Sequence, residues 1–559
     1  MLPRLRARLP RVLSLLSILA LAACGGGEDG AAPVPPPPET GPRLTVDCSG
    51  PRCGAIDAHR YAGSGVGVWQ YTNDTDERVE VPVSIDGIPG KDVHLSYVNQ
   101  ADARQKLPPL ELFLRSPYVD AAASTALLRA AGPASNPAES RLPRAPHAPY
   151  DMRALPRPRV KTASGPALTR MAAAASHRVG DTKEWWVNDF SYRDDAKALR
   201  PTTLRRTFRV DGADPRTLNI WVEDAVTDAG VLTDEALDQL QQGIRSTYDR
   251  VTRIAGPIWN ENPYEDIIGA GEDLNVVIVE RMEVLGYVSY TDSYVRHYYP
   301  DLPRIQQSNE ALAVYMHART IYAPDDVYTD FIQNFSHELT HIVFWFYRGI
   351  LGGNEYTLDS WLNETVAEAM KDLVYHPDDP APSDTASRFR DWMIWGQRGG
   401  FNCDLRDMYP IPSPDRACYG YNTVNTLAAY LMRQHGADLF VSLLNDFSST
   451  NSFEVLDHSI RQVGGDGFQA MLRRFGSSAA LFPAAASPSG FGYPERHEGE
   501  ISLIPLDGAR YADTTALPNS VPLYLEPYGF FPFVRPRILG SYRETLLVPP
   551  RSSLSIVIR

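Results

Sequence analysis

One stretch of the sequence, residues 326–349 (DVYTDFIQNFSHELTHIVFWFYRG), constrains the fold more than any other. Its apolar residues recur mostly every three or four positions, which predicts one long α-helix. Aromatic residues also occupy other faces, so we expect a helix that is buried nearly all round. His337, Glu338 and His341 lie inside this helix, and they need partners because an unpaired buried polar group is costly.

The two histidines are four residues apart in an HExxH pattern. This spacing puts both imidazoles on one helical face, where they can bind a single metal ion, usually tetrahedral zinc. Glu338 follows the first histidine and can reach a water molecule beside the ion. The alternative is a pair of solvent-exposed histidines, and the apolar surroundings argue against it.

A second helix is predicted over residues 360–374 (SWLNETVAEAMKDLV), with Asp359 or Ser360 as its cap. It carries Glu364 and Glu368, which are four positions apart and therefore share a face. A glutamate from this helix would supply the third metal ligand, and from the spacing alone either of the two is able to do so.

HExxH followed by a glutamate-bearing helix resembles the gluzincins, the thermolysin-like zinc peptidases. The WLNE-x-x-x-E form of the second helix is most similar to the hyicolysin type of bacterial peptidase. The resemblance implies one zinc ion per chain, held by His337, His341 and Glu364. It also implies Glu338 as the general base and Glu368, in place of the aspartate of thermolysin, as the carboxylate that orients the first histidine.

The whole chain predicts an α+β multidomain protein, with a thermolysin-like zincin catalytic domain of a mixed sheet and active-site helices, and accessory β domains. The expected divisions are a signal peptide (1–23), a flexible tether (24–44), an N-terminal β domain (45–118), an Ala/Pro/Arg-rich linker (119–180), the peptidase domain (181–477) and a small C-terminal β domain (478–559).

Residues 311–316 are the last predicted strand before the HExxH helix. In gluzincins the strand at this place is the sheet edge that an extended peptide joins, so the resemblance implies the same here. An internal strand without a ligand role is the alternative.

A third helix is predicted to begin after Cys418 and to end at Gly436. Tyr419 or Tyr421 at its start resembles the tyrosine that gluzincins direct at the substrate carbonyl. The spacing from Tyr421 to Tyr430 favours Tyr421 for this catalytic role. A tyrosine of the core or rim is the alternative.

The first 23 residues have the pattern of an export signal, with four arginines followed by an apolar run that is short for a membrane span. The sequence Leu-Ala-Ala-Cys at its end resembles the lipobox of bacterial lipoproteins. The resemblance implies cleavage before Cys24, lipidation of Cys24 and sorting to the outer membrane. An ordinary signal peptide is the alternative.

Four further cysteines support export, because an even number in an exported chain favours disulfide bonds. Pairing of close neighbours, Cys48 with Cys53 and Cys403 with Cys418, is the simplest of three connectivities. A zinc site made of all four is the alternative, but no C-x-x-C spacing is present.

The net charge and the motifs limit the classes of function that the chain can have. Net charge is −14, and removal of the first 23 residues with their four arginines makes it −14 − 4 = −18, so we expect no nucleic-acid partner. The motifs predict a zinc endopeptidase that acts on protein or peptide substrates. The alternatives are an aminopeptidase, for which the amine-binding G-x-M-E-N motif is missing although Glu310 is nearby, and a non-catalytic surface lipoprotein such as an adhesin.

Overall fold

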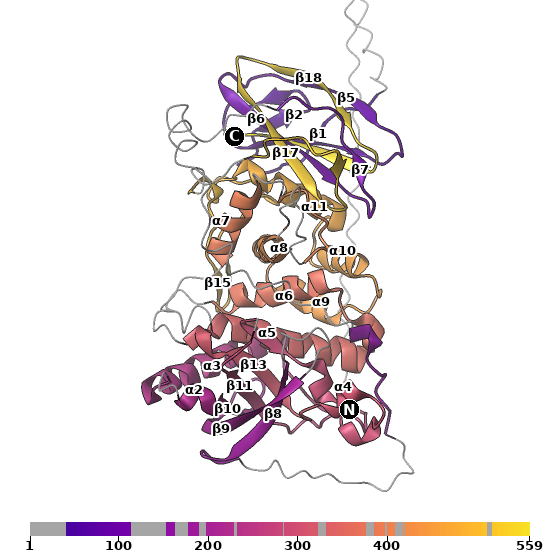
Figure 1. The fold of residues 1–559 in the computed structure, drawn as a ribbon. Coiled ribbons are helices and arrows are strands. Elements are labelled where there is room, and N and C mark those ends of the chain that lie inside the picture. Colours follow the sequence, from indigo (N-terminus) through magenta and orange to yellow (C-terminus); the bar gives the residue numbers. More distant parts are fainter. Residues whose placement is uncertain are drawn as a thin grey trace, which may run out of the picture. The chain divides into compact units, whose positions relative to one another are not determined.

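A mixed sheet and the helices packed on it form the part of the protein that contains the HExxH helix (Figure 1). The computed structural model describes residues 41–112, 152–161, 177–188, 197–228, 232–282, 284–321, 331–375, 385–396, 400–408, 418, 420–510 and 517–559. The expected signal peptide with Cys24, and most of the expected linker, lie outside the described residues. Within those ranges, no helix has the length and apolar character needed to cross a membrane.

The sheet has six strands among the described residues. Their order is β12 (Gly286–Val288), β13 (Leu312–His317), β11 (Leu274–Val279), β10 (Arg216–Glu223), β9 (Lys197–Val210) and β8 (Thr182–Asn188). The central strand β11 runs parallel to both of its neighbours, and β12, β9 and β8 pair antiparallel with theirs. Strand β11 is buried along its whole length, and all its residues except Asn275 are apolar.

The expectation that residues 311–316 form the edge of the sheet is wrong. Strand β13 is internal because β12 pairs with it antiparallel, Gly286 opposite Met316 and Val288 opposite Val314. Strand β12 is only three residues long, too short for its side-chain pattern to predict a strand. The edge beside the HExxH helix is therefore β12.

The HExxH helix is shorter and less regular than predicted. Helix α5 (Gln333–Phe344) continues directly into a π-helix (Trp345–Gly352), and Gly353, at a φ of 112°, follows it. The predicted end at Gly349 is therefore wrong, and the predicted start at 326 lies outside the described residues. Nearly every residue of α5 is buried, as the sequence predicts.

The two other helices predicted above are present with similar bounds, and the first of them, α6 (Ser360–Leu373), carries the two glutamates. A further helix, α3 (Asp234–Ala255), is capped by the Thr233 side chain. Helix α8 (Gly420–His435) follows Cys418 closely. Four more helical elements are α7 (Thr385–Gly396), α9 (Ala437–Asn445), α10 (Ser452–Gln462) and α11 (Phe468–Gly476). Helices α5, α6 and α8 share one apolar core with a face of the sheet.

Strands from the two ends of the described chain form one β structure rather than two separate ones. One sheet has the order β1 (Thr45–Val46), β4 (Gly67–Asn73), β19 (Ser552–Ile558), β6 (Lys91–Asn99) and β17 (Phe530–Ile538). Two further pairs are β5 (Val79–Ile85) with β18 (Tyr542–Val548), and β7 (Gln105–Lys106) with β16 (Tyr524–Leu525). Both segments contribute to a single apolar core. The side-chain pattern predicts such strands but not their distant partners.

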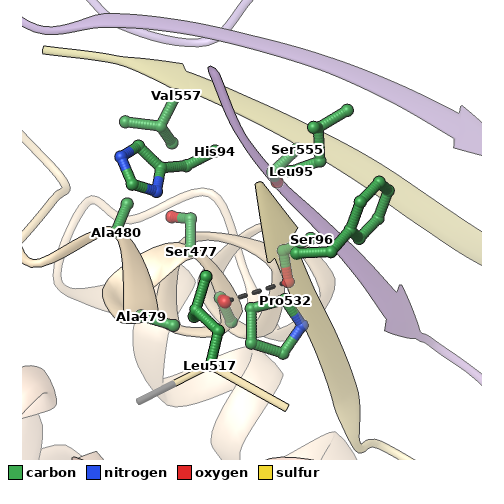
Figure 2. A pocket seen from close by; sticks show the side chains of 12 residues that line it. His94, Leu95, Ser96, Ser477, Ala479, Ala480, Leu517, Pro532, Ser555 and Val557 are labelled. Carbon is green, nitrogen blue, oxygen red and sulfur yellow. Dashed lines mark hydrogen bonds between the residues drawn. The ribbon is translucent and has the colours of Figure 1, made fainter. Parts of the chain in front are cut away.

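A small cavity lies where this β structure meets residues 477–480 (Figure 2). His94 of β6 lines it together with serines and small apolar side chains, and its volume is about 10 Å³. This is room for about one water molecule. Burial lowers the pKa of His94 to about 3, so the ring is neutral. A cavity of this size has no room for a peptide substrate.

Both expected disulfide bonds are present. Cys48 is bonded to Cys53 beside strand β4, and Cys403 is bonded to Cys418 just before helix α8. The alternative of a zinc site made of all four cysteines is thereby removed.

Candidate metal centre

Two helices bring three metal-binding side chains together. His337 and His341 come from α5 and Glu364 from α6, and ligand atoms of all three lie within 4.8 Å of one another. The two Nε2 atoms are 3.2 Å apart, and the Glu364 carboxylate lies 3.1 Å from Nε2 of His337 and 3.7 Å from Nε2 of His341. Ligands that bind tetrahedral zinc at about 2.0–2.1 Å are about 3.3 Å from each other, so these spacings match such a site.

Within the described part of the chain, one oxygen of the Glu364 carboxylate is buried without an aligned hydrogen bond. Among the described residues, its buried Oε2 has no aligned hydrogen bond, although Nε2 of His337 is 3.1 Å away. A buried carboxylate oxygen without a hydrogen bond is costly. A divalent ion bound by Glu364 and two neutral histidines would satisfy it, so the residues present fit zinc.

Glu368 lies on the other side of the His337 ring from Glu364. Its Oε1 is 3.1 Å from Nδ1 of His337, and its Oε2 accepts from the Asn425 amide at 2.6 Å and pairs with the Lys371 ammonium at 3.2 Å. Burial opposes ionisation of Glu368, but Lys371 and His337 hold its pKa well below the usual value. The carboxylate can therefore accept the Nδ1 proton, which leaves Nε2 free for a metal.

The two histidines differ in charge. Burial alone would lower the pKa of His337, but the carboxylates of Glu364 and Glu368 raise it to about 10. Burial lowers the pKa of His341 to about 4. The two carboxylates on either side of the His337 ring therefore favour a positive charge at this position, which a bound divalent ion would supply.

His341 contacts helix α6 and the residues after β12 through one amide. The Asn363 side-chain nitrogen is 3.1 Å from Nδ1 of His341 and donates to the Tyr290 hydroxyl at 3.3 Å. Asn363 is buried. This contact holds Nδ1 of His341 in place, and Nδ1 is the ring nitrogen that faces away from the proposed metal.

Glu338 lies beside the edge strand. A side chain at Gly286 of β12 would meet Cγ of Glu338 at 3.1 Å and Oε1 at 3.2 Å, so only glycine fits there without displacing the carboxylate. Burial raises the pKa of Glu338 to about 8. A nearby cation would favour the ionised form again. The Glu338 carboxyl group thus lies against β12, the strand edge that a peptide could join.

The structure says less about the role of the last predicted site residue, Tyr421. Tyr421 lies in the first turn of α8, is partly buried and packs against the main apolar core. Its catalytic role stays a prediction. The sequence patterns did not single out Lys371 or Tyr290, and Asn363 stood out only as part of the WLNE pattern. Lys371 lies one turn beyond Glu368 on the same helix, a spacing that could have pointed to it.

Comparisons with known proteins place the chain among peptidases. A family model described as Peptidase M30 matches residues 196–559, and a model described as a domain of unknown function matches residues 46–112. No curated protein matches the chain. An M1 zinc metallopeptidase from Deinococcus radiodurans is similar at 13% identity with a TM-score of 0.28, over 56% of this chain and 64% of that one. A mutant of that enzyme bound to a Tyr-Ser-Ala substrate matches at 14% identity with a TM-score of 0.26, over 62% and 63%.

Proposed function

Because the chain belongs to the Peptidase M30 family and is a metallopeptidase, we propose that it is a zinc-dependent endopeptidase with one zinc ion per chain. The observation that carries the proposal is the convergence of His337, His341 and Glu364 to zinc-ligand spacing, with Glu338 beside them at a strand edge. The WLNE-x-x-x-E form of helix α6 supports a place near the hyicolysin type.

Each residue has a distinct task in this proposal. Bound zinc would act as a Lewis acid that polarises a carbonyl and lowers the pKa of water. Glu338 takes the proton of the attacking water and returns it to the leaving amine. Tyr421 donates a hydrogen bond to the substrate carbonyl oxygen. Glu368 holds His337 in the tautomer and orientation that a ligand needs.

The substrate is proposed to bind as an added strand. Strand β12 is the edge next to Glu338, and its outer backbone groups face away from β13. An extended peptide can pair with such an edge through its main chain, which tolerates many sequences. The glycine at position 286 lets the peptide and the Glu338 carboxylate come close.

Endopeptidase action is favoured over aminopeptidase action by where the acids lie. The nearest candidate for binding a substrate amine, Glu310, accepts a hydrogen bond from the Arg296 backbone at 2.7 Å and pairs with its side chain at 3.5 Å. The residue that follows β12 is Ser289, which carries no charge. Because Arg296 already occupies the Glu310 carboxylate, we propose that Glu310 does not bind a substrate amine.

We expect the purified protein to cleave a peptide that is blocked at both ends, and to lose this activity when a chelator removes the metal. Added zinc should restore it. Mass spectrometry of the products with and without chelator checks this. Single residues released only from peptides with a free amino terminus would instead assign an aminopeptidase. No cleavage of any peptide or of casein would favour a binding protein.

We further propose that the protein is an outer-membrane lipoprotein anchored through Cys24, on the strength of the lipobox resemblance alone. Cells grown with a fatty-acid analogue should label the wild-type protein and leave Cys24→Ser unlabelled, because the thiol is the site of attachment. Equal labelling of both proteins, or of neither, would contradict lipidation at this residue.

A further inference from the structure

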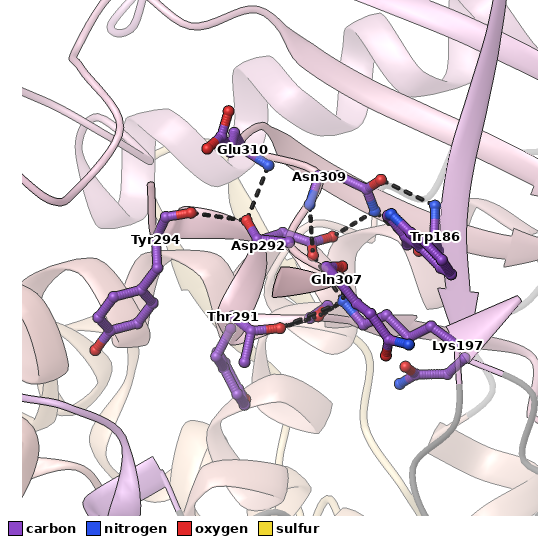
Figure 3. Close-up of polar contacts among 12 residues, drawn as sticks. Trp186, Lys197, Thr291, Asp292, Tyr294, Gln307, Asn309 and Glu310 are labelled. Carbon is purple, nitrogen blue, oxygen red and sulfur yellow. Dashed lines mark hydrogen bonds and ion pairs between the residues drawn. The ribbon is translucent and has the colours of Figure 1, made fainter. Parts of the chain in front are cut away.

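A buried ammonium group lies against the residues that follow edge strand β12 (Figure 3). Lys197, the first residue of β9, has a side chain that is only 6% exposed. Its Nζ donates to Asp292 Oδ1 at 2.8 Å, Ser289 Oγ at 2.9 Å, Thr291 Oγ1 at 3.3 Å and the Gln307 carbonyl at 3.1 Å. An ammonium has three protons, so four acceptors within this range satisfy it completely.

The carboxylate partner is equally well enclosed. The side chain of Asp292 is 3% exposed. Besides Lys197, it accepts from the backbone and side-chain nitrogens of Asn309, each at 3.1 Å, and from the Tyr315 hydroxyl of β13. Asn309 in turn exchanges two hydrogen bonds with the Trp186 backbone of β8, at 2.8 and 2.9 Å.

A cluster of this kind fixes a position more than it adds stability. The cost of burying two charges offsets most of their attraction, so a buried pair of this sort is weak evidence for stability. Here three of the groups that bind Lys197 belong to residues 289–292, and the rest of the cluster belongs to strands β8, β9 and β13 and to residues 307–309. The cluster therefore attaches the segment after β12 to the sheet.

The same segment contacts both metal-binding helices. The Trp345 indole, one turn after His341 in the HExxH helix, donates to Ser293 Oγ at 3.1 Å, and its ring lies 5.3 Å from that of Tyr290. The Tyr290 hydroxyl meets the Asn363 amide at 3.3 Å, and this amide meets Nδ1 of His341 at 3.1 Å.

The tautomer of a metal-binding histidine determines which group donates and which accepts in each of these contacts. If Nε2 of His341 binds zinc, Nδ1 must carry the proton and donate it. The Asn363 amide then has to present its oxygen to Nδ1, which a half-turn of the amide achieves. The same oxygen has a second lone pair, and the Tyr290 hydroxyl can donate to it. Tyr290 would thus hold the amide in the orientation that the metal-bound histidine requires.

We propose that the Lys197–Asp292 cluster positions residues 289–293 so that Tyr290 orients Asn363 and, through it, the ligand His341. Lys197 and Tyr290 are positioning residues, since they act through other side chains. Because residues 289–293 continue β12, the same cluster sets the end of the edge on which a peptide is expected to pair. This inference rests on the proposed zinc peptidase function.

The test compares Tyr290→Phe, Lys197→Met and the control Arg216→Met. The affinity of each metal-free protein for zinc is titrated against a competing chelator, and KM and kcat are measured with a blocked peptide.

Tyr290→Phe should weaken zinc binding by roughly threefold to tenfold, less than the ~10–100-fold typical of a residue that bonds a ligand directly. Lys197→Met should weaken it by about tenfold. Both should raise KM more than they lower kcat, because the peptide-binding edge is displaced.

Arg216→Met removes a different buried ion pair, with Asp214 at 3.2 Å. The Arg216 guanidinium also donates to the Tyr248 hydroxyl and to the backbone carbonyls of Trp259, Ala270 and Glu272. Arg216→Met should lower the midpoint of thermal unfolding as Lys197→Met does but leave zinc affinity and KM unchanged. Tyr290→Phe removes only one hydroxyl from a partly exposed side chain, so this variant should fold. Its zinc affinity and KM therefore test the inference even if Lys197→Met does not fold. Zinc affinity and KM within about twofold of wild type in Tyr290→Phe would overturn the inference. Wild-type protein that binds no zinc would instead refute the proposed function.

Discussion

Replacing Glu338 with glutamine is expected to lower kcat by roughly a thousandfold, the order seen when a general base is removed. Glutamine has nearly the volume of glutamate, so it should fit beside Gly286, where the carboxyl group now lies. Zinc should remain bound with unchanged affinity, because Glu338 is not among the three residues that converge on the metal position.

The measurement is steady-state turnover of a blocked peptide by protein whose zinc content has been determined. Glu526→Gln is a suitable control, because Glu526 is also buried but pairs with Arg104 next to strand β16. That variant should keep wild-type turnover. Full turnover by Glu338→Gln would eliminate it as the general base.

Glu364→Ala and Glu368→Ala are expected to differ sharply in zinc affinity, although the two glutamates share one helical face. The Glu364 carboxylate lies on the Nε2 side of both histidines, whereas Glu368 contacts Nδ1 of His337. Glu364→Ala removes a ligand and should abolish binding at micromolar zinc. Glu368→Ala removes a group that orients a ligand and should weaken binding by only about ten- to a hundredfold.

Titration of both metal-free variants with zinc against a chelator of known affinity makes this comparison direct. Circular dichroism should show that each variant keeps its helices, since Lys371 and Asn425 lose a partner in Glu368→Ala. If Glu368→Ala binds zinc more weakly than Glu364→Ala, the two roles must be exchanged.

The sequence predicts that His337 and His341 converge with a glutamate of the second helix, as they do, because this information is local. Residues four apart on a helix share a face whatever surrounds them, so the HExxH helix and the glutamate-bearing helix could each be recognised alone. The spacing on the second helix also left open which glutamate approaches Nε2. That choice depends on how α5 and α6 cross, which no pattern within one helix contains.

The parts that the sequence did not predict depend on contacts between distant segments. Lys197 and Asp292 look like ordinary surface charges in the sequence, and only the folded sheet buries them together. Strand β12 is too short for a side-chain period, so the sequence points to β13 as the edge. The strands β17 and β19 are long enough to predict, but their pairing with the N-terminal strand β6 joins segments far apart in the sequence and no local pattern contains it.

The position of β19 between β4 and β6 has a consequence for biosynthesis. The Asn73 side chain, at the end of β4, bonds to the Val548 carbonyl across 475 residues, and the strands themselves pair over similar separations. Translation delivers the N-terminal strands first, and β4 and β6 then lack the neighbour that joins them until residues 552–558 have left the ribosome. Unpaired strand edges promote aggregation, so a chaperone or rapid export would protect the nascent chain during that interval.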